Sequence, residues 1–332
     1  MTMDETDLRI VNLLQIDPRM PWARVGQILG ISAATASHRW ARLTSEGLAW
    51  ITTLPNMDQQ LTAIVEVDCT TKHLPTTIDE LCRHPMILSV DETTGERDIL
   101  LTISAPDMPT LTTLIIDWIG SLPGVHGTRT SLTTNVIVGT EAWRVHAIDQ
   151  NEANAAAEQL PRKKPVGQAP NPELDMALAK ALAADGRRSV ASLSQEFDSP
   201  TTTVHRRLQR LRSCRQVIMR CDVAPELAGW FLECTWLTTV AFSHKPRIME
   251  LLRDRRVLRS CMWLTGANNL RLNLRVASHN AIADVESSIA AAIPGLAPAE
   301  TIVHMRSHKS MGWLLTGQGR STGTLVPPFF KI

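Results

Sequence analysis

The sequence contains no apolar run that approaches the ~20 residues needed to cross a membrane. Its first ten residues, MTMDETDLRI, are acidic and lack the apolar segment of a secretion signal. We therefore expect a cytoplasmic protein with no membrane partner.

Cysteine occurs at positions 69, 82, 214, 221, 234 and 261, never as a C-x-x-C pair and never with histidines at metal-ligand spacing. Zinc sites need ligand pairs at short characteristic spacings, and a cytosolic protein keeps its thiols reduced. We expect reduced thiols and no bound metal ion.

The motifs of the common enzyme classes are missing too. There is no Gly-rich phosphate loop before a helix, no nucleophile elbow and no H-E-x-x-H. We therefore expect no catalytic residues, no enzyme activity and no cofactor.

The most informative feature that is present is a long internal repeat. Hydrophobic residues make up 44% of the 332 residues, which is enough to build more than one folded domain. A shift of 168 positions places Asp7 over Asp175, Thr35 over Thr203 and Arg39 over Arg207 without a gap. A repeat of this length indicates duplicated domains.

The first copy contains a stretch, residues 32–48, that resembles the second helix of a helix-turn-helix. Ala36, Trp40 and Leu43 fall at i, i+4 and i+7, so one face is apolar. Ser32 stands at the N-cap, and residues 22–29 predict the preceding short helix. Hydroxyls and cations on the other faces suit phosphates and base edges, and the predicted DNA contacts are Ser32, Thr35, Ser37, His38, Arg39 and Arg42.

The second copy keeps the same apolar stripe at Val204, Leu208 and Leu211, with Ser199 as the expected cap and Pro200 at the first helical position. Its predicted DNA contacts are Thr201, Thr202, Thr203, His205, Arg206, Arg207 and Arg210. An ordinary amphipathic helix would explain one such stretch, but a polar surface repeated twice favours DNA binding. Arg39 and Arg207 are alternatively positioning residues that hold phosphate without reading sequence.

Arginine is concentrated in the second helix-turn-helix. Only Glu196 and Asp198 oppose the cations there, which are Arg187, Arg188, Arg206, Arg207, Arg210, Arg212, Arg215 and Arg220. Such a basic surface supplies salt-sensitive affinity for nucleic acid. We expect the second half to carry more of the electrostatics.

Each helix-turn-helix is followed by a segment whose pattern predicts the order βαββαβ, that of a ferredoxin-like split unit. The expected strands are 61–69, 87–92, 98–104 and 130–138, then 231–242, 257–264, 270–276 and 301–305; the expected helices are 75–83 and 108–121, then 247–253 and 281–293. A short strand at 50–54 is a candidate wing. The predicted fold class is therefore α+β, with two winged-helix-like helix-turn-helix domains, each followed by a ferredoxin-like domain.

These patterns divide the chain into six segments. We expect helix-turn-helix domains at 1–54 and 172–222, and αβ domains at 58–146 and 229–316. Residues 147–171 are rich in Ala, Pro, Gln and Asn and predict a linker, and the tail at 317–332 is expected to be loosely held.

The order of these elements resembles the Lrp/AsnC family of bacterial and archaeal transcriptional regulators. The first half carries D-x-x-D-L-x-I at 4–10, L-G-I-S at 29–32 and R-x-x-R-L-x-x-E-G at 39–47. The resemblance covers roughly 4–143 and 173–313, like a tandem fusion of two members. The second half departs from it, with Phe197-Asp198-Ser199-Pro200 in place of L-G-I-S and no glycine after its recognition helix.

The resemblance implies three partners. Members bind double-stranded DNA as dimers joined through the αβ (RAM) domain, so a homo-oligomer through these domains is expected, although one chain could itself supply a pseudo-dimer. Many members bind an amino acid near a T-G-x-x-D turn, which predicts an effector site at Thr94, Gly95, Asp98, Gly266 and Asn269. The alternative is that both glycines only permit a tight hairpin.

The sequence also allows an alternative function. The sirohaem decarboxylases of haem biosynthesis share this architecture and are also fused in pairs. Their Asn-Leu-Trp stretch has no match in the nearest counterparts here, residues 261–263 and 268–271. The arginines of the second helix-turn-helix favour the regulator.

Overall fold

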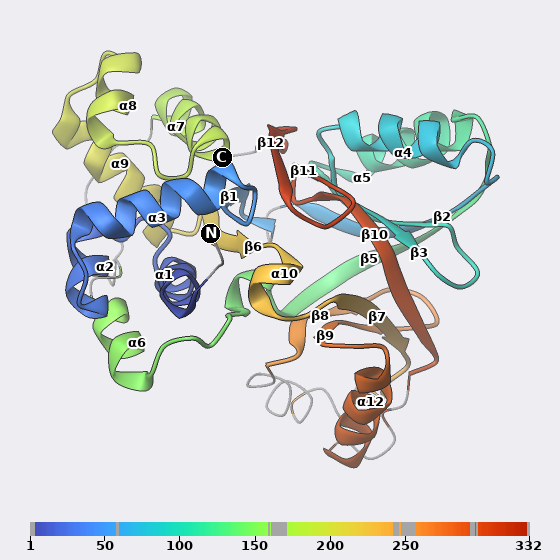
Figure 1. Ribbon diagram of the computed structural model, residues 1–332. Helices are drawn as coiled ribbons and strands as arrows, with labels where there is room; N and C mark the ends of the chain where they lie inside the picture. Colours follow the sequence, from blue (N-terminus) through green and yellow to red (C-terminus); the bar gives the residue numbers. More distant parts are fainter. Residues whose placement is uncertain are drawn as a thin grey trace.

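The computed structural model describes residues 4–57, 60–158, 160, 171–241, 246, 256–292, 296 and 298–330. The helix-turn-helix elements of both halves gather on one side of the molecule, and the two αβ units gather on the other (Figure 1). Within these ranges, no helix is both long enough and apolar enough to cross a membrane.

The first helix-turn-helix consists of α1 (Glu5–Ile16), α2 (Trp22–Leu29) and α3 (Ala33–Ser45), followed by strand β1 (Ala49–Pro55). The Ser32 side chain accepts a hydrogen bond from the backbone N–H of Thr35, as predicted for an N-cap. Ala36, Trp40 and Leu43 are buried. The helices and their caps therefore follow the sequence pattern closely.

The second helix-turn-helix consists of α7 (Pro172–Ala184), α8 (Val190–Glu196) and α9 (Thr201–Ser213), followed by β6 (Val217–Val223). The predicted cap is wrong here. Pro200, not Ser199, occupies the N-cap position, and no side chain caps α9. The cause is one residue of register, since Pro200 with φ −53° and ψ 140° is still outside the helix.

The strand that follows each helix-turn-helix does not stand alone as a wing. β1 pairs antiparallel with β6, and Thr52 lies opposite Arg220. These two residues are counterparts in the repeat, because 52 and 220 differ by 168. A pseudo-twofold axis therefore passes through this ladder, which joins the two helix-turn-helix domains.

The αβ units confirm the βαββαβ order where the structure describes them. The first unit contains β2 (Leu61–Cys69), α4 (Leu74–Arg83), β3 (Ile87–Thr93), β4 (Ile99–Ala105), α5 (Met108–Thr112) and β5 (Val125–Val138). The second contains β7 (Leu232–Thr238), β8 (Leu258–Leu264), β9 (Leu270–Val276), α12 (Asn280–Ala292) and β10 (Glu300–Ser310), and the short α10 (Pro225–Ala228) precedes it. The helix predicted at 247–253 lies outside the described residues.

Three elements are longer or less regular than predicted. The helix expected at 108–121 is α-helical only to Thr112, and continues as a π-helical segment (Thr113–Trp118) and a 3-10 turn (Ile119–Ser121). β5 and β10 extend several residues beyond the predicted strands. The extra residues of β5, 125–129, pair with β2 of the same unit. The extra residues of β10, by contrast, pair with β3 of the other half, which the periodicity of one sheet face does not reveal.

β5 and β10 each belong to two sheets. β5 pairs with β2 through Leu132 and then with β8 from Thr133 onward. β10 pairs with β7 through Val303 and then with β3 from His304 onward. The strands thus close a ring in the order β3-β4-β2-β5-β8-β9-β7-β10. In Figure 1 the helices α4 and α5 lie outside one part of the ring and α12 outside the other.

The expected linker and tail are both packed against the domains. Helix α6 (Gln150–Ala157) lies in the linker and is anchored on the first helix-turn-helix, where Arg9 pairs with Glu152 and Asn12 accepts hydrogen bonds from Ala147 and Ile148. The tail forms β12 (Ser321–Leu325) against β11 (Trp313–Leu315). Phe330, 4% exposed, enters the core of the second helix-turn-helix. The tail prediction is therefore wrong, because its apolar residues complete cores in both halves.

The exits of α3 and α9 differ at one matched position. Gly47 adopts φ +67°, and its counterpart Arg215 is forced into the same left-handed region at φ +52°. A residue with a Cβ pays roughly 1–2 kcal/mol there. Ser321 of the tail packs against Gly47, and a Cβ added at Gly47 would lie 2.2 Å from the Ser321 carbonyl oxygen. In the first half, glycine is therefore required for space as well as for its backbone conformation.

We predict that Arg215→Gly raises the free energy of unfolding by about 0.5–1 kcal/mol, because it removes left-handed strain at a partial entropic cost. Chemical denaturation measures this change. The matched control is Arg215→Ala, which keeps the strain and loses only the exposed ion pair to Glu141. Equal stability of the two variants would contradict the prediction.

Candidate nucleic-acid interface

The N-terminal half of α3 presents small polar side chains to solvent. Ser32, Thr35 and His38 are exposed, and Ser37 is half-buried. Ser32 and Thr35 are hydrogen-bonded to each other at 2.8 Å between their hydroxyl oxygens, which fixes the start of the helix. Both hydroxyls lie at the helix N-terminus, where backbone N–H groups and the helix dipole favour an anion.

Arg39 and Arg42 do not extend freely from this face. Arg39 contacts Asp4 at 2.7 Å and Asp7 at 3.0 Å, and Arg42 contacts the other oxygen of Asp7. Asp7 is completely buried, so these ion pairs tie α3 to α1. The carboxylates raise the pKa of Arg39 although burial opposes them. The structure therefore gives both arginines an internal role that the sequence pattern did not indicate.

The corresponding face of α9 contains exposed Thr201, Thr202, His205 and Arg206, with Thr203 half-buried. Arg207, by contrast, is 6% exposed and contacts Asp175 at 3.1 Å. Asp175 is the repeat counterpart of Asp7, so the same ion pair holds the recognition helix of each half. Arg207 is thus placed inside the domain, whereas Arg206 lies on the surface.

Most other arginines of the second helix-turn-helix also have partners within the protein. Arg187 donates to the carbonyls of Pro18 and Met20, while its counterpart Arg19 donates to those of Gly186 and Arg188. This exchange bridges the two domains across the pseudo-twofold axis. Burial lowers the pKa of Arg187 to about 10. The remaining pairs are Arg188 with Glu196, Arg212 with Asp17, Arg215 with Glu141 and Arg220 with Asp222.

The expectation of a broad arginine surface is therefore corrected. These cations were opposed in sequence by only two local acids, but acids distant in the chain, such as Asp17 and Asp175, reach them in the fold. The arginine excess consequently does not separate a DNA-binding protein from another function. The exposed polar face of the two recognition helices remains as the candidate interface.

The two T-G turns join the αβ units to each other. The Thr94 N–H donates to the carbonyl of Val303, and the Val303 N–H donates to the Thr94 hydroxyl. Thr265 makes the same two bonds with Leu132. Gly95 and Gly266 follow these threonines with φ of +99° and +102°, a region open to glycine. Both glycines thus permit tight turns, and the threonines of these turns form hydrogen bonds between the halves.

Asp98 and Asn269 hold the ends of neighbouring strands. The Asp98 carboxylate accepts from the Cys69 N–H at 2.7 Å. The Asn269 side chain accepts from the Val240 N–H and donates to the Val240 carbonyl. The predicted effector residues thus come together within each turn, and the side chains of Asp98 and Asn269 already make hydrogen bonds within the protein.

A separate cavity of about 460 Å³ lies between the strand ring and the β1–β6 ladder. Its lining comes from both αβ sheets, from β6 and from the tail, so no single sequence segment could indicate it. Within the described ranges, no group of three or more His, Cys, Asp or Glu residues is placed to hold a metal ion.

Comparison with family models identifies the domains. The AsnC-type helix-turn-helix domain matches residues 3–44 and 173–212, and the Lrp/AsnC ligand binding domain matches residues 62–143. The chain therefore carries two AsnC-type helix-turn-helix domains and an Lrp/AsnC ligand-binding domain, as the resemblance predicted.

Named relatives match about 40% of this chain. The HTH-type transcriptional regulator FL11 of Pyrococcus horikoshii is 28% identical over 134 residues, which cover 39% of this chain and 88% of the relative. The HTH-type transcriptional regulator LysM of Saccharolobus solfataricus is 29% identical over 132 residues, which cover 39% and 92%. This chain is about twice the length of one such regulator.

Among solved structures, the siroheme decarboxylase NirDL is similar over the whole chain. The TM-score is 0.58, the sequence identity is 10%, and 93% of each chain is covered. At this identity the likeness shows the fold alone. It agrees with the tandem architecture described above.

We predict that Asp175→Ala lowers the free energy of unfolding by about 3–5 kcal/mol, because it leaves the buried Arg207 guanidinium without its carboxylate. Urea denaturation measures the loss. The double variant Asp175→Leu/Arg207→Met should recover most of it, and the exposed Arg206→Ala should stay within about 0.5 kcal/mol of wild type. Arg207→Ala with unchanged stability would show that the pair does not hold the helix.

Proposed function

Since this chain belongs to the Lrp/AsnC family and fuses two of its units, we propose that it is a sequence-specific DNA-binding transcriptional regulator and not an enzyme. The single observation that supports this most is the pair of AsnC-type helix-turn-helix domains, each with an exposed polar face on its recognition helix. One chain then supplies both recognition helices, α3 and α9, of a pseudo-dimer; these are its two reading heads.

The proposed contact surface is narrower than the sequence pattern suggested. In the first half it comprises Ser32, Thr35, Ser37 and His38, and in the second half Thr201, Thr202, Thr203, His205, Arg206 and the half-buried Arg210. Hydroxyls and imidazoles can contact phosphates and base edges. Arg39 and Arg42 are partly exposed and form ion pairs with Asp7, so a phosphate contact from either would form beside that ion pair. Arg207 is left out because it is buried.

We further propose that the protein acts in the cytoplasm, responds to a small effector such as an amino acid, and associates further through its αβ domains. The match to the Lrp/AsnC ligand binding domain at 62–143 supports the effector, and the other two points rest on the resemblance to the family. An effector at the turns of Thr94, Gly95, Asp98, Gly266 and Asn269 stays a prediction, because the described contacts of these residues are internal.

The alternative is a decarboxylase of the sirohaem type. The whole-chain likeness to NirDL favours it as a fold, with a TM-score of 0.58. The regulator is preferred because the sequence relatives FL11 and LysM are named transcriptional regulators. Incubation of the purified protein with sirohaem separates the two, since an enzyme would release carbon dioxide and lower the mass of the tetrapyrrole, which mass spectrometry measures, and a regulator would leave that mass unchanged.

We predict that the protein binds the DNA upstream of its own gene in the presence of competitor DNA, with affinity that falls steeply with salt. Arg206→Ala should lower the magnitude of the salt slope by about one, because one phosphate contact is lost. Filter binding or fluorescence anisotropy at several salt concentrations, with and without mixed amino acids, measures both effects. Arg83→Ala, an exposed arginine on α4, is the control. Absence of binding at low salt would refute the regulator.

We predict that selection of binding sites from random DNA yields an asymmetric sequence. The two reading heads differ at matched positions, since Ser32 corresponds to Pro200 and His38 to Arg206. Symmetry in a bound site mirrors symmetry in the protein. Recovery of a perfect palindrome would count against two different reading heads on one chain.

A further inference from the structure

The inner faces of the two αβ sheets carry different residue types at three positions that the repeat matches. At an offset of 171 (Thr94 to Thr265), the first sheet carries Leu88, Leu100 and Ser104 where the second carries Arg259, Arg271 and Arg275. The three arginines line the cavity between the strand ring and the β1–β6 ladder. The second half therefore has three guanidinium groups at positions where the first half has two leucines and a serine.

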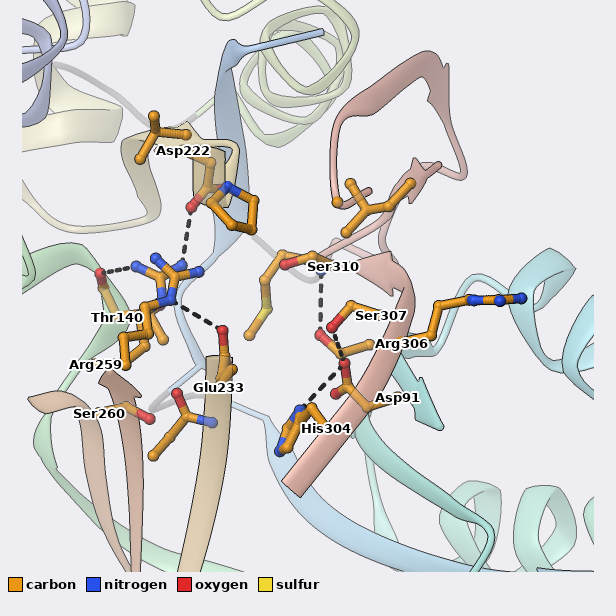
Figure 2. A pocket seen from close by; sticks show the side chains of 18 of the residues that line it. Asp91, Thr140, Asp222, Glu233, Arg259, Ser260, His304, Arg306, Ser307 and Ser310 are labelled. Atoms are coloured by element: carbon orange, nitrogen blue, oxygen red, sulfur yellow. Dashed lines mark hydrogen bonds and ion pairs between the residues drawn. The ribbon is translucent and has the colours of Figure 1, made fainter. Parts of the chain in front are cut away.

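Two of these arginines are neutralised inside the protein. Arg259 contacts Asp222 at 2.9 Å, and Arg275 contacts Glu233 at 2.9 Å. Burial lowers the pKa of Arg259 to about 9. Burial would raise the pKa of Glu233, but Arg275 and the other cations near it lower the value to about 2. Figure 2 shows Arg259, Asp222 and Glu233 together on one side of the cavity.

Arg271 is different. It is 6% exposed, and no carboxylate of the described residues lies within 4 Å of its guanidinium group. Its Nη2 donates to the Thr235 hydroxyl at 3.1 Å, while its Nε is buried and has no hydrogen-bond partner. A buried cation without a counter-ion is costly. The site is therefore incomplete as it stands.

The acids around the cavity are already engaged. Asp222 binds Arg220 and Arg259, Glu226 pairs with Arg320, and Asp91 accepts from Ser307 and faces His304. Burial lowers the pKa of His304, but Asp91 raises it above its ordinary value. This favours a second positive charge beside Arg271. In Figure 2 His304 points toward Asp91, and Arg306 points away from the cavity.

We propose that this cavity binds a small organic carboxylate, whose carboxylate group pairs with Arg271. A guanidinium group favours carboxylates because its fork of N–H donors matches their two oxygens. The cavity volume of about 460 Å³ lies in the range of small-molecule sites. The amide of Asn273 and the hydroxyl of Ser260 line the same wall and can hydrogen-bond to the rest of the ligand.

The position of the cavity suggests how the ligand would be sensed. Arg220 lies opposite Thr52 at the centre of the β1–β6 ladder, lines the cavity, and has a buried Nη2 without a partner. A ligand bound there would contact the ladder that joins the two helix-turn-helix domains. This coupling rests on the proposed function, whereas carboxylate binding does not.

The test uses Arg271→Leu, because Leu100 shows that the fold accepts leucine at the matched position. The thermal unfolding temperature is measured with sodium acetate, disodium 2-oxoglutarate or L-glutamate against sodium chloride at equal ionic strength, and titration calorimetry gives the affinity. Wild type should be stabilised saturably by at least one of the three. Arg271→Leu should be no less stable without ligand and should bind the same carboxylate at least about tenfold more weakly.

Arg271→Met serves if the leucine variant does not fold, and Arg83→Leu controls for the loss of a distant surface charge. A wild-type protein that responds to none of the three carboxylates would overturn the proposal, as would an Arg271 variant that responds as wild type does. Preference for L-glutamate over 2-oxoglutarate would identify an amino acid as the ligand class. Because binding is measured on the protein alone, a failure to bind DNA is a separate result.

Discussion

The whole architecture depends on two strands that each belong to both αβ units. β5 leaves β2 to pair with β8, and β10 leaves β7 to pair with β3. Because the continued strands form ladders with the other half, neither unit has a free sheet edge at this point. The pairing between halves is therefore an internal property of the chain. The bonds of Thr94 and Thr265, and those of Arg19 and Arg187, are likewise reciprocal between the two halves.

The duplication has left the two halves free to differ. Asp7 and Asp175 hold their recognition helices by the same ion pair, so this contact is preserved in both. The exits of those helices differ, with glycine at 47 and a strained arginine at 215. The sheet interiors differ more, since Leu100 packs in an apolar cluster and Arg271 lines a cavity. The contacts that the two halves share hold the fold together. The positions at which the halves differ are those where we expect their functions to differ.

The sequence predicted the fold well where a signal is local. The apolar stripe of Ala36, Trp40 and Leu43 defined α3, and alternation defined β2 and β9 to the residue. It failed where the cause is distant. The sequence predicts Arg207 as a surface cation, but in the fold it is buried and paired with Asp175, which lies 32 residues away in the chain. Phe330 stands in a polar, Gly-rich tail and still enters a core. The lining of the cavity is drawn from segments more than 100 residues apart, which no periodicity can join.

The most direct test of the account is a hydroxyl-radical footprint on the selected DNA site, made with wild type and with a variant in which Thr201, Thr202 and Arg206 of α9 are alanine. One chain with two reading heads predicts two protected patches for wild type and the loss of one of them in the variant. A single patch for wild type, or equal weakening of both patches in the variant, would contradict the claim that each half of the chain reads its own part of the site.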